Sequence, residues 1–168
     1  ELARVTDRGI RESGMLDMKQ LVLEKDKSVI GIFCDNAVTD HDGNLFDACS
    51  YASTAAINSC KIPKYEMQDE RPVKIEDEFS EPPITTLPVS VTMAKIGDFI
   101  LVDPTIEEWG IMDARITITS NSDGNVVALQ KGGSDGFSQE ELIECAELSI
   151  KVGSKIREII KQSKQSDN

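Results

Sequence analysis

The chain has 168 residues, which is enough for one well-formed hydrophobic core but short for two independent domains. Apolar residues make up 39% of it, which indicates a folded rather than a disordered protein. The formal net charge is −12, whereas proteins that bind nucleic acids unaided are usually basic. A role on RNA or DNA therefore requires a local basic patch or a basic partner protein.

No stretch approaches the ~20 apolar residues of a membrane span, and the sequence does not open with a charged and then apolar leader. We therefore expect a cytoplasmic protein with no membrane partner. Cys34, Cys49, Cys60 and Cys145 show no CxxC spacing, and the only histidine, His41, lies in a polar turn. This pattern predicts no metal site and no cofactor, and favours buried thiols in a reducing compartment.

The first element expected in chain order is a helix over residues 1–13. Arg4, Arg8 and Arg11 are four and three residues apart, so they form one stripe on the same side of such a helix. The stripe could be a solvated face, a set of ion pairs with neighbouring acids, or a surface that binds anions. The spacing alone leaves these alternatives open.

The rest of the first half is expected to be mostly extended. Runs rich in valine and isoleucine predict strands at 21–23 and 28–34. Segment 61–86 contains four prolines and clustered acids, which is typical of an exposed connection, with a short strand at 73–75. The sequence therefore divides into two halves joined by an acidic, proline-rich linker.

Between these segments lies a candidate phosphate site. A turn at 42–44, a short strand over 43–48 and a helix near 50–60 are predicted, which places residues 49–57 at a strand-to-helix junction. Small hydroxyl residues at the start of a helix often hold phosphate, because its free N–H groups and positive dipole end attract the anion. This stretch, however, contains no Lys, no Arg and no run of glycine.

The second half contains four predicted strands, at 89–95, 99–102, 114–120 and 126–130, and the third of them alternates apolar and polar residues. Gly97-Asp98 and residues 123–125 are plausible hairpin turns. Both halves run strand, Asp-Gly-Asn turn, strand, loop and helix, which indicates two copies of one β-β-α type unit. The predicted class is α+β, with mixed sheets covered by packed helices.

A long helix is expected at the C-terminal end, beginning with a capping box formed by Ser138 and Glu141 and fraying from Ser163. The glycine-rich loop 132–136 before it could cradle a phosphate. It lacks the Lys-Ser/Thr pair of a P-loop, so a turn into the helix is the simpler interpretation.

Carboxylates offer two further candidate sites. Asp40, Asp42 and Asp47 lack the EF-hand spacing, so we interpret them as parts of a solvated turn rather than a calcium site. Asp103 and Asp113 follow or begin apolar strands, where carboxylates commonly face a cleft and can serve in acid/base or metal chemistry. Hydrogen-bonded turn roles are the alternative for both.

Several ordered stretches resemble the ribonuclease PH family. They are ELARVTDRGIRES (1–13), DGNLFDA (42–48), LVDPTIEE (101–108), MDARITIT (112–119) and LQKGG (129–133). The resemblance covers nearly the whole chain and is nearest to the non-catalytic ring subunits of archaeal exosomes. It implies a ribonuclease PH-like fold with a pseudo-repeat. Residues 1–86 would be the C-terminal part of the first half with the acidic linker, and 87–168 the second half.

The family's N-terminal portion is expected to be missing, because the helical pattern starts at Leu2 without a capping residue before it. Its absence should leave sheet edges uncovered and favour self-association. The resemblance further implies a hexameric ring in which three such subunits alternate with three catalytic siblings, as three heterodimers. Single-stranded RNA threads the channel and is shortened from its 3′ end by phosphate, and RNA-binding cap proteins join the ring.

The resemblance also implies roles for particular residues. Ser53 stands where catalytic members carry a phosphate-binding arginine, so the chain is expected to be inactive by itself. Asp113 matches the family's catalytic aspartate and would be a remnant. Arg4 and Arg8 match positions that contact RNA beside the sibling's active site, with Arg11 as a third candidate. Two alternatives are a catalytically active phosphorolytic exoribonuclease and a pure scaffold subunit of a eukaryotic exosome ring.

Overall fold

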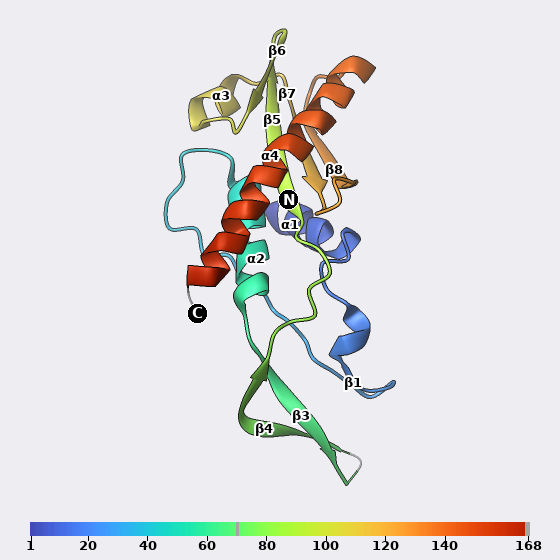
Figure 1. Cartoon of the computed structure of the whole chain (residues 1–168). Helices are drawn as coiled ribbons and strands as arrows, with labels where there is room; N and C mark the ends of the chain where they lie inside the picture. The colour runs from blue at the N-terminus through green and yellow to red at the C-terminus, as the bar shows by residue number, and fades with distance from the viewer. Residues whose placement is uncertain (70, 167–168) are drawn as a thin grey trace.

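The computed structural model describes residues 1–69 and 71–166, which form helices packed on antiparallel sheets (Figure 1). The first half contains α1 (Leu2–Glu12), a 3-10 turn η1 (Met18–Leu21), β1 (Val22–Glu24), β2 (Ser28–Val29) and α2 (Leu45–Ser59). The hairpin β3 (Ile62–Gln68) and β4 (Arg71–Ser80) follows. The second half contains β5 (Val89–Ile96), β6 (Phe99–Val102), α3 (Ile106–Ile111), β7 (Ala114–Ser120), β8 (Val126–Gly133) and α4 (Gln139–Ser166).

The four strands of the second half form one antiparallel sheet in the order β6-β5-β7-β8. All four predicted strands are confirmed, and the turns at Gly97-Asp98 and 123–125 join paired strands as expected. Gly97 and Gly124 both have positive φ, a conformation that costs glycine little because it has no Cβ. These turns fix the register by which alternate residues face the two sides of the sheet.

One face of this sheet is apolar and is covered by α4, which crosses it obliquely in Figure 1. The core cluster joins alternate residues of β5 and β7 to Cys145 and Ile160 of α4; the strand residues are Val89, Val91, Met93, Ile116 and Ile118. Arg157 of α4 is buried as well, and its Nη1 donates to the Ser120 carbonyl at 3.0 Å. The capping box of Ser138 and Glu141 starts the helix as predicted.

The other face carries buried hydroxyls instead of apolar side chains. Ser90 and Thr119 are hydrogen-bonded at 2.8 Å between their side-chain oxygens, and Thr92 and Thr117 make the same contact at 2.8 Å. α1 and α2 cover this face, and Gly9 of α1 lies so close that a Cβ there would be 3.2 Å from Thr119 Cγ2. Because each hydroxyl has a partner, the face can be buried without the cost of unpaired polar groups.

Asp47 of α2 is a buried charged group in this polar layer, with 3% of its surface exposed. Its carboxylate accepts from the Thr92 N–H at 2.9 Å and the Thr92 hydroxyl at 2.8 Å, and also from Asn44 Nδ2 at 2.9 Å. Asn44 Nδ2 also donates to Asp103 at 2.7 Å. Burial raises the pKa of Asp47 to about 6, and the neighbouring Asp103 charge adds to the rise.

The predicted strand over 43–48 is wrong, because α2 begins at Leu45. Asn44 adopts a left-handed conformation, and its side-chain oxygen accepts the N–H of Asp47 as a helix cap. The Asp-Gly-Asn stretch therefore starts a helix rather than a hairpin. Cys49 and Ser53 consequently lie inside the helix.

The strand predicted at 28–34 is only two residues long, Ser28–Val29. Within the described residues, 31–40 make no backbone-to-backbone hydrogen bond, because no strand lies beside them. Residues 31–34, which the sequence predicts as part of a strand, are therefore unpaired, and Phe33 is 92% exposed. The strand predicted at 21–23 is confirmed with a shift of one residue.

The described residues of the linker up to Ser80 are exposed or half-exposed, as predicted, whereas Pro82 and Thr86 are buried. Most of the linker is the hairpin β3–β4, and the short strand expected at 73–75 lies inside β4. Neither strand has a buried face, so the alternation of apolar and polar residues that predicts a half-buried strand is absent from their sequence. The sequence analysis also missed α3, although Thr105 and Glu108 form a capping box at its start. The loop at 132–136 begins inside β8, and α4 continues past Ser163 to Ser166.

We predict that this chain self-associates through the unpaired segment 31–40. An extended segment with free N–H and C=O groups and an exposed aromatic ring can pair with another chain. Phe33→Glu should reduce the association in sedimentation velocity over a concentration series. Phe99→Glu is the control, since Phe99 is 73% exposed but ends a paired hairpin. A wild-type chain that stays monomeric at every concentration would show that the segment is not adhesive.

We also predict that Asp47 makes the protein less stable as pH rises from about 4 to 6. The folded pKa of about 6 exceeds the ordinary value of 3.8, so the native state binds more protons than the unfolded state in this window. The contribution of Asp47 to the free energy of unfolding should fall there by about 3 kcal/mol, at about 1.4 kcal/mol per pKa unit. Urea titrations of wild type and Asp47→Asn across this range measure the difference.

The matched control is Asp98→Asn, which neutralises an exposed aspartate in the turn between β5 and β6. Its pH dependence should follow that of the wild type. If Asp47→Asn also keeps the wild-type pH dependence, Asp47 titrates as an ordinary carboxylate.

Candidate functional site

The arginine stripe lies where the sequence places it, along one side of α1. Arg4 and Arg8 are exposed, and neither has an ion pair with any residue that the structure describes. Arg11 is paired with Asp7 one turn earlier, in an ion pair that is exposed on both sides. The opposite side of the helix is buried against the polar face of the sheet. Two of the three arginines are therefore free to bind an anion.

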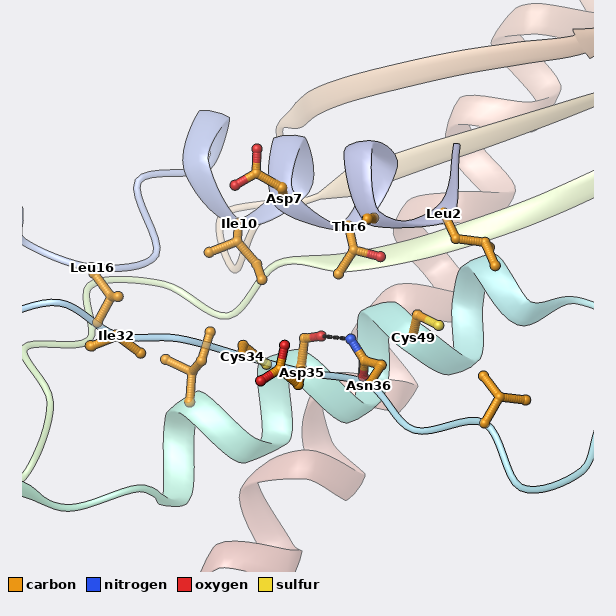
Figure 2. Close-up of a pocket in the computed structure, with 14 residues that line it drawn as sticks. Leu2, Thr6, Asp7, Ile10, Leu16, Ile32, Cys34, Asp35, Asn36 and Cys49 are labelled. Carbon is orange, nitrogen blue, oxygen red and sulfur yellow. Dashed lines mark hydrogen bonds between the residues drawn. The ribbon is translucent and has the colours of Figure 1, made fainter.

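The candidate phosphate site at 49–57 is not at the start of a helix, so the prediction of a strand-to-helix junction there is wrong. Ser53 lies in the middle of α2 and is fully buried. Its Oγ accepts from Asn36 Nδ2 at 2.9 Å, as the dashed line in Figure 2 marks. Ser53 thus anchors the segment before α2 to the helix. Its assignment as the replacement for a phosphate-binding arginine rests on the family resemblance.

The true N-terminus of α2, at Leu45, is poorly suited to a phosphate. The side chain of Asn44 already takes the Asp47 N–H, and the carboxylates of Asp47 and Asp103 converge on Asn44. Neither the first turn of α2 nor residues 38–44 before it contains a cation. An anion placed there would meet these two carboxylates, and the Arg115 guanidinium beside Phe46 is buried and already paired with Glu1.

The two candidate catalytic aspartates are held in separate turns, at opposite ends of β6. Asp113 Oδ2 accepts from the Gly97 N–H at 2.7 Å, and its own N–H donates to the Lys95 carbonyl. Asp103 has a left-handed backbone and accepts from Asn44. The structure therefore does not bring them together, and both have the hydrogen-bonded turn roles that were the alternative interpretation.

The structure brings together an aromatic cluster that the sequence analysis missed. Arg115 of β7 is only 6% exposed, and its guanidinium lies 4.2 Å from the Phe46 ring centre and 5.2 Å from that of Trp109. Glu1 pairs with its Nη2 at 2.8 Å, whereas Nη1 has no partner among the described residues. A Cβ on Gly132 would collide with this guanidinium at 2.7 Å. That glycine therefore makes room for Arg115.

No sequence signal marks this cluster, because its four side chains come from α1's start, α2, α3 and β7. The glycine-rich stretch 132–136 is the second candidate phosphate site in the sequence. In the structure, Gly132 and Gly133 end β8 and pack against β7, so they make close strand contacts instead.

Two cavities adjoin α1. The larger, about 500 Å³, lies between α1, α2 and the segment before α2 (Figure 2). Its walls are mostly apolar, from Leu2, Ile10, Leu16, Ile32 and Ile57, and the Thr6 hydroxyl beside it has no partner among the described residues. The smaller, about 200 Å³, lies between the starts of α1, α2 and α3.

The cysteines are unbridged, and Cys49 and Cys145 are buried, as expected for structural thiols. Burial raises the pKa of the Cys145 thiol to about 11. Cys34, in contrast, is exposed, so the prediction of buried thiols is wrong for it. Within residues 1–69 and 71–166 no three His, Cys, Asp or Glu side chains are grouped as metal ligands. In the same residues, no helix is both long and apolar enough to cross a membrane.

Comparison with curated proteins finds archaeal exosome subunits. The chain is 44% identical over 161 residues to the exosome complex component Rrp42 of Pyrococcus horikoshii. The alignment covers 95% of this chain and 59% of that protein. The chain therefore spans a little under three fifths of the length of this relative.

Solved structures agree with this result. An archaeal exosome core matches with a TM-score of 0.78 and 37% identity, over 95% of this chain and 62% of that one. The Archaeoglobus fulgidus exosome with RNA bound to the active site matches with a TM-score of 0.76 and 36% identity, over 94% of this chain and 59% of that one. The ribonuclease PH-like α+β fold that the sequence predicts is thereby confirmed.

Family comparison assigns most of the chain to two successive domains. Residues 1–63 match domain 1 of the 3′ exoribonuclease family, and residues 86–152 match its domain 2. The two matches flank the β3–β4 hairpin, and their order along the chain is that of the family. The chain belongs to the 3′ exoribonuclease, or ribonuclease PH, family.

Proposed function

We propose that this chain is a non-catalytic subunit of an archaeal exosome ring, located in the cytoplasm. In that ring it shapes the active site of a catalytic ribonuclease PH-like sibling and guides single-stranded RNA toward phosphate-dependent 3′–5′ degradation. The similarity to Rrp42 subunits and to exosome cores supports the ring. We propose that the ring consists of three heterodimers and binds RNA-binding cap proteins. We also propose that residues 1–86 and 87–168 are the two ribonuclease PH-like halves of the chain.

The observation that carries the non-catalytic role is the charge at the start of α2. A phosphate nucleophile needs a fixed positive charge, and a bidentate arginine supplies it best. Here Asp47 and Asp103 converge on Asn44, and no cation lies in the first turn of the helix. Asp113 meanwhile holds the turn at Gly97. These contacts favour a structural use of residues that resemble catalytic ones.

The unpaired Arg4 and Arg8 favour contact with RNA over a purely structural role. They are one helical turn apart on a chain of net charge −12, so they form a local basic stripe in an acidic protein. A self-sufficient exoribonuclease is the weaker candidate, because the carboxylates of Asp47 and Asp103 converge at the start of α2, where a phosphate would need a positive charge. A pure scaffold of a eukaryotic ring is the weaker candidate because it gives these arginines no role.

We predict that the purified chain, without its sibling, releases no nucleoside diphosphate from poly(A) in the presence of inorganic phosphate. Ser53→Arg should not create activity, because this position is buried inside α2 and a preorganised site needs several groups in productive geometry. Thin-layer chromatography of labelled products measures release. The ring assembled with an active sibling is the positive control, and diphosphate release by the unmodified chain alone would contradict the proposal.

We predict that Arg4→Ala and Arg8→Ala each weaken RNA binding by the assembled ring about equally for different RNA sequences. Phosphate contacts carry no base information, so each loss should also flatten the log–log salt dependence by roughly 0.7. Arg11→Ala should have a smaller effect, because Asp7 already pairs with it. Fluorescence anisotropy over a salt series measures both quantities, with the sibling's catalytic residues disabled.

Lys155→Ala is the matched control, since it removes an exposed cation from α4 instead of α1. Its affinity and salt slope should equal those of the unmodified ring. If the double variant of Arg4 and Arg8 also equals the unmodified ring, the stripe is a solvated face and the RNA role is wrong.

A further inference from the structure

The cavity of about 200 Å³ has an apolar lining and an exposed edge. Leu45 and Phe46 at the start of α2 form one wall, and Ile106 and Trp109 of α3 form another. Leu2 of α1 also lines it. Ile106 is 45% exposed, so a large apolar side chain remains partly uncovered at the cavity. Apolar pockets of this kind receive anchor side chains at protein interfaces.

The walls of the cavity are held rigidly. The rings of Phe46 and Trp109 are stacked, with centres 5.8 Å apart and planes inclined by 18°. The buried guanidinium of Arg115 lies against both rings, and Glu1 fixes it by an ion pair. At the edge, Gly43 contacts the backbone at Thr105, which closes the gap between α2 and α3. A ligand therefore meets a preformed site and spends little free energy on ordering it.

Acidic residues surround this cavity in the sequence. Residues 38–47 and 103–113, which supply most of the lining, contain no Lys or Arg. Asp40, Asp42 and Glu107 are exposed and adjoin lining residues directly. The Arg115 guanidinium behind the two rings is buried and paired with Glu1, so the exposed charge beside the cavity is acidic. This charge repels an RNA backbone and attracts a protein surface with Lys or Arg.

The Phe46 ring gives the same preference. Phe46 is almost fully buried, and its ring already contacts Trp109 and Arg115. It therefore offers no open face on which a nucleobase could stack, which is the usual way in which aromatic residues hold single-stranded RNA. A compact aliphatic or aromatic side chain can fill the cavity without such a face.

We propose that this cavity is the docking site for one large apolar side chain of the ribonuclease PH-like sibling subunit, presented beside Lys or Arg. This inference rests on the proposed function, since the sibling exists only in the proposed ring. The cavity adjoins α1, whose arginine stripe is assigned to the RNA path beside the sibling's active site. The same helix end would then serve both the RNA path and the subunit contact.

Trp109 is the only tryptophan of the chain and lines the cavity, so its fluorescence reports occupancy directly. The probe is the purified, tryptophan-free sibling subunit, titrated into the unmodified chain. We expect the emission to shift to shorter wavelength and acrylamide quenching to fall by about 2-fold as the sibling excludes water from the indole ring. Raising the salt concentration should weaken the association, because the acidic surroundings contribute to it.

Ile106→Ala should weaken association with the sibling by about 10-fold, a loss typical of an interface residue next to an anchor. The matched control is Ile111→Ala in the same helix, because Ile111 is 67% exposed and does not line the cavity. Its affinity should stay within about 2-fold of the wild type. Glu107→Lys should also weaken association, and Glu144→Lys on α4 controls for the change in net charge. Circular dichroism verifies that each variant is folded.

The results separate the docking site from the proposed function. If the wild type forms a ring with the sibling but Ile106→Ala assembles equally well, or Trp109 emission does not change, the docking site is wrong and the ring stands. If oligo(A) alone shifts Trp109 emission while the sibling does not, the cavity is a nucleobase site, and our inference is wrong. If the wild type does not associate with the sibling at all, the proposed function fails and the docking site fails with it.

Discussion

The hydrogen bonds between the Asp47 carboxylate and Thr92 connect the two halves of this protein. Asp47 belongs to α2 and Thr92 to β5, 45 residues further along the chain. Asn44 extends the connection to Asp103, and thereby to the end of β6. Burying a carboxylate costs free energy unless it is paired or hydrogen-bonded. A different packing of α2 on the sheet would separate the Asp47 carboxylate from the Thr92 donors and leave it without these hydrogen bonds. The start of α2 is thus determined by polar contacts.

This constraint explains why the start of α2 resembles a ligand site. It has the helix terminus, the turn of glycine and asparagine, and the convergent polar side chains that phosphate sites use. Its donors, however, are already occupied, because Asn44 Nδ2 and the Thr92 N–H donate to the Asp47 carboxylate. The exposed basic charge lies instead on α1, at Arg4 and Arg8. The molecule therefore separates the position that would bind phosphate from the surface that is proposed to contact RNA.

The sequence predicted the elements that have a local pattern of apolar residues or a local cap. β5 and β7 alternate apolar and polar residues, β6 and β8 are short apolar runs beside turn residues, α1 and α4 carry recognisable helical patterns, and the capping box of Ser138 and Glu141 is local. The arginine stripe was also predictable, because it depends only on spacing within one helix. Asp103 and Asp113 could be identified as strand-end carboxylates, but their partners depend on register and turn geometry.

The errors have physical causes. Leu45 and Phe46 resemble a strand because local composition does not reveal that Asn44 caps a helix. Residues 31–34 have the composition of a strand but lack a neighbour, and pairing is a property of two segments. Arg115 in its aromatic cluster depends on three other elements, and such long-range contacts leave no pattern in a single sequence.

The β3–β4 hairpin is not packed into the body of the molecule. Its strands contact mainly each other, and in Figure 1 it extends away from the helices and the four-stranded sheet. None of its described residues, 62–69 and 71–80, belongs to the hydrophobic core cluster. Insertions, deletions and changes of charge in this ribbon therefore leave the packing of the core intact. Related chains are free to diverge here in length and surface chemistry, and selection on the hairpin acts through what it meets outside the subunit.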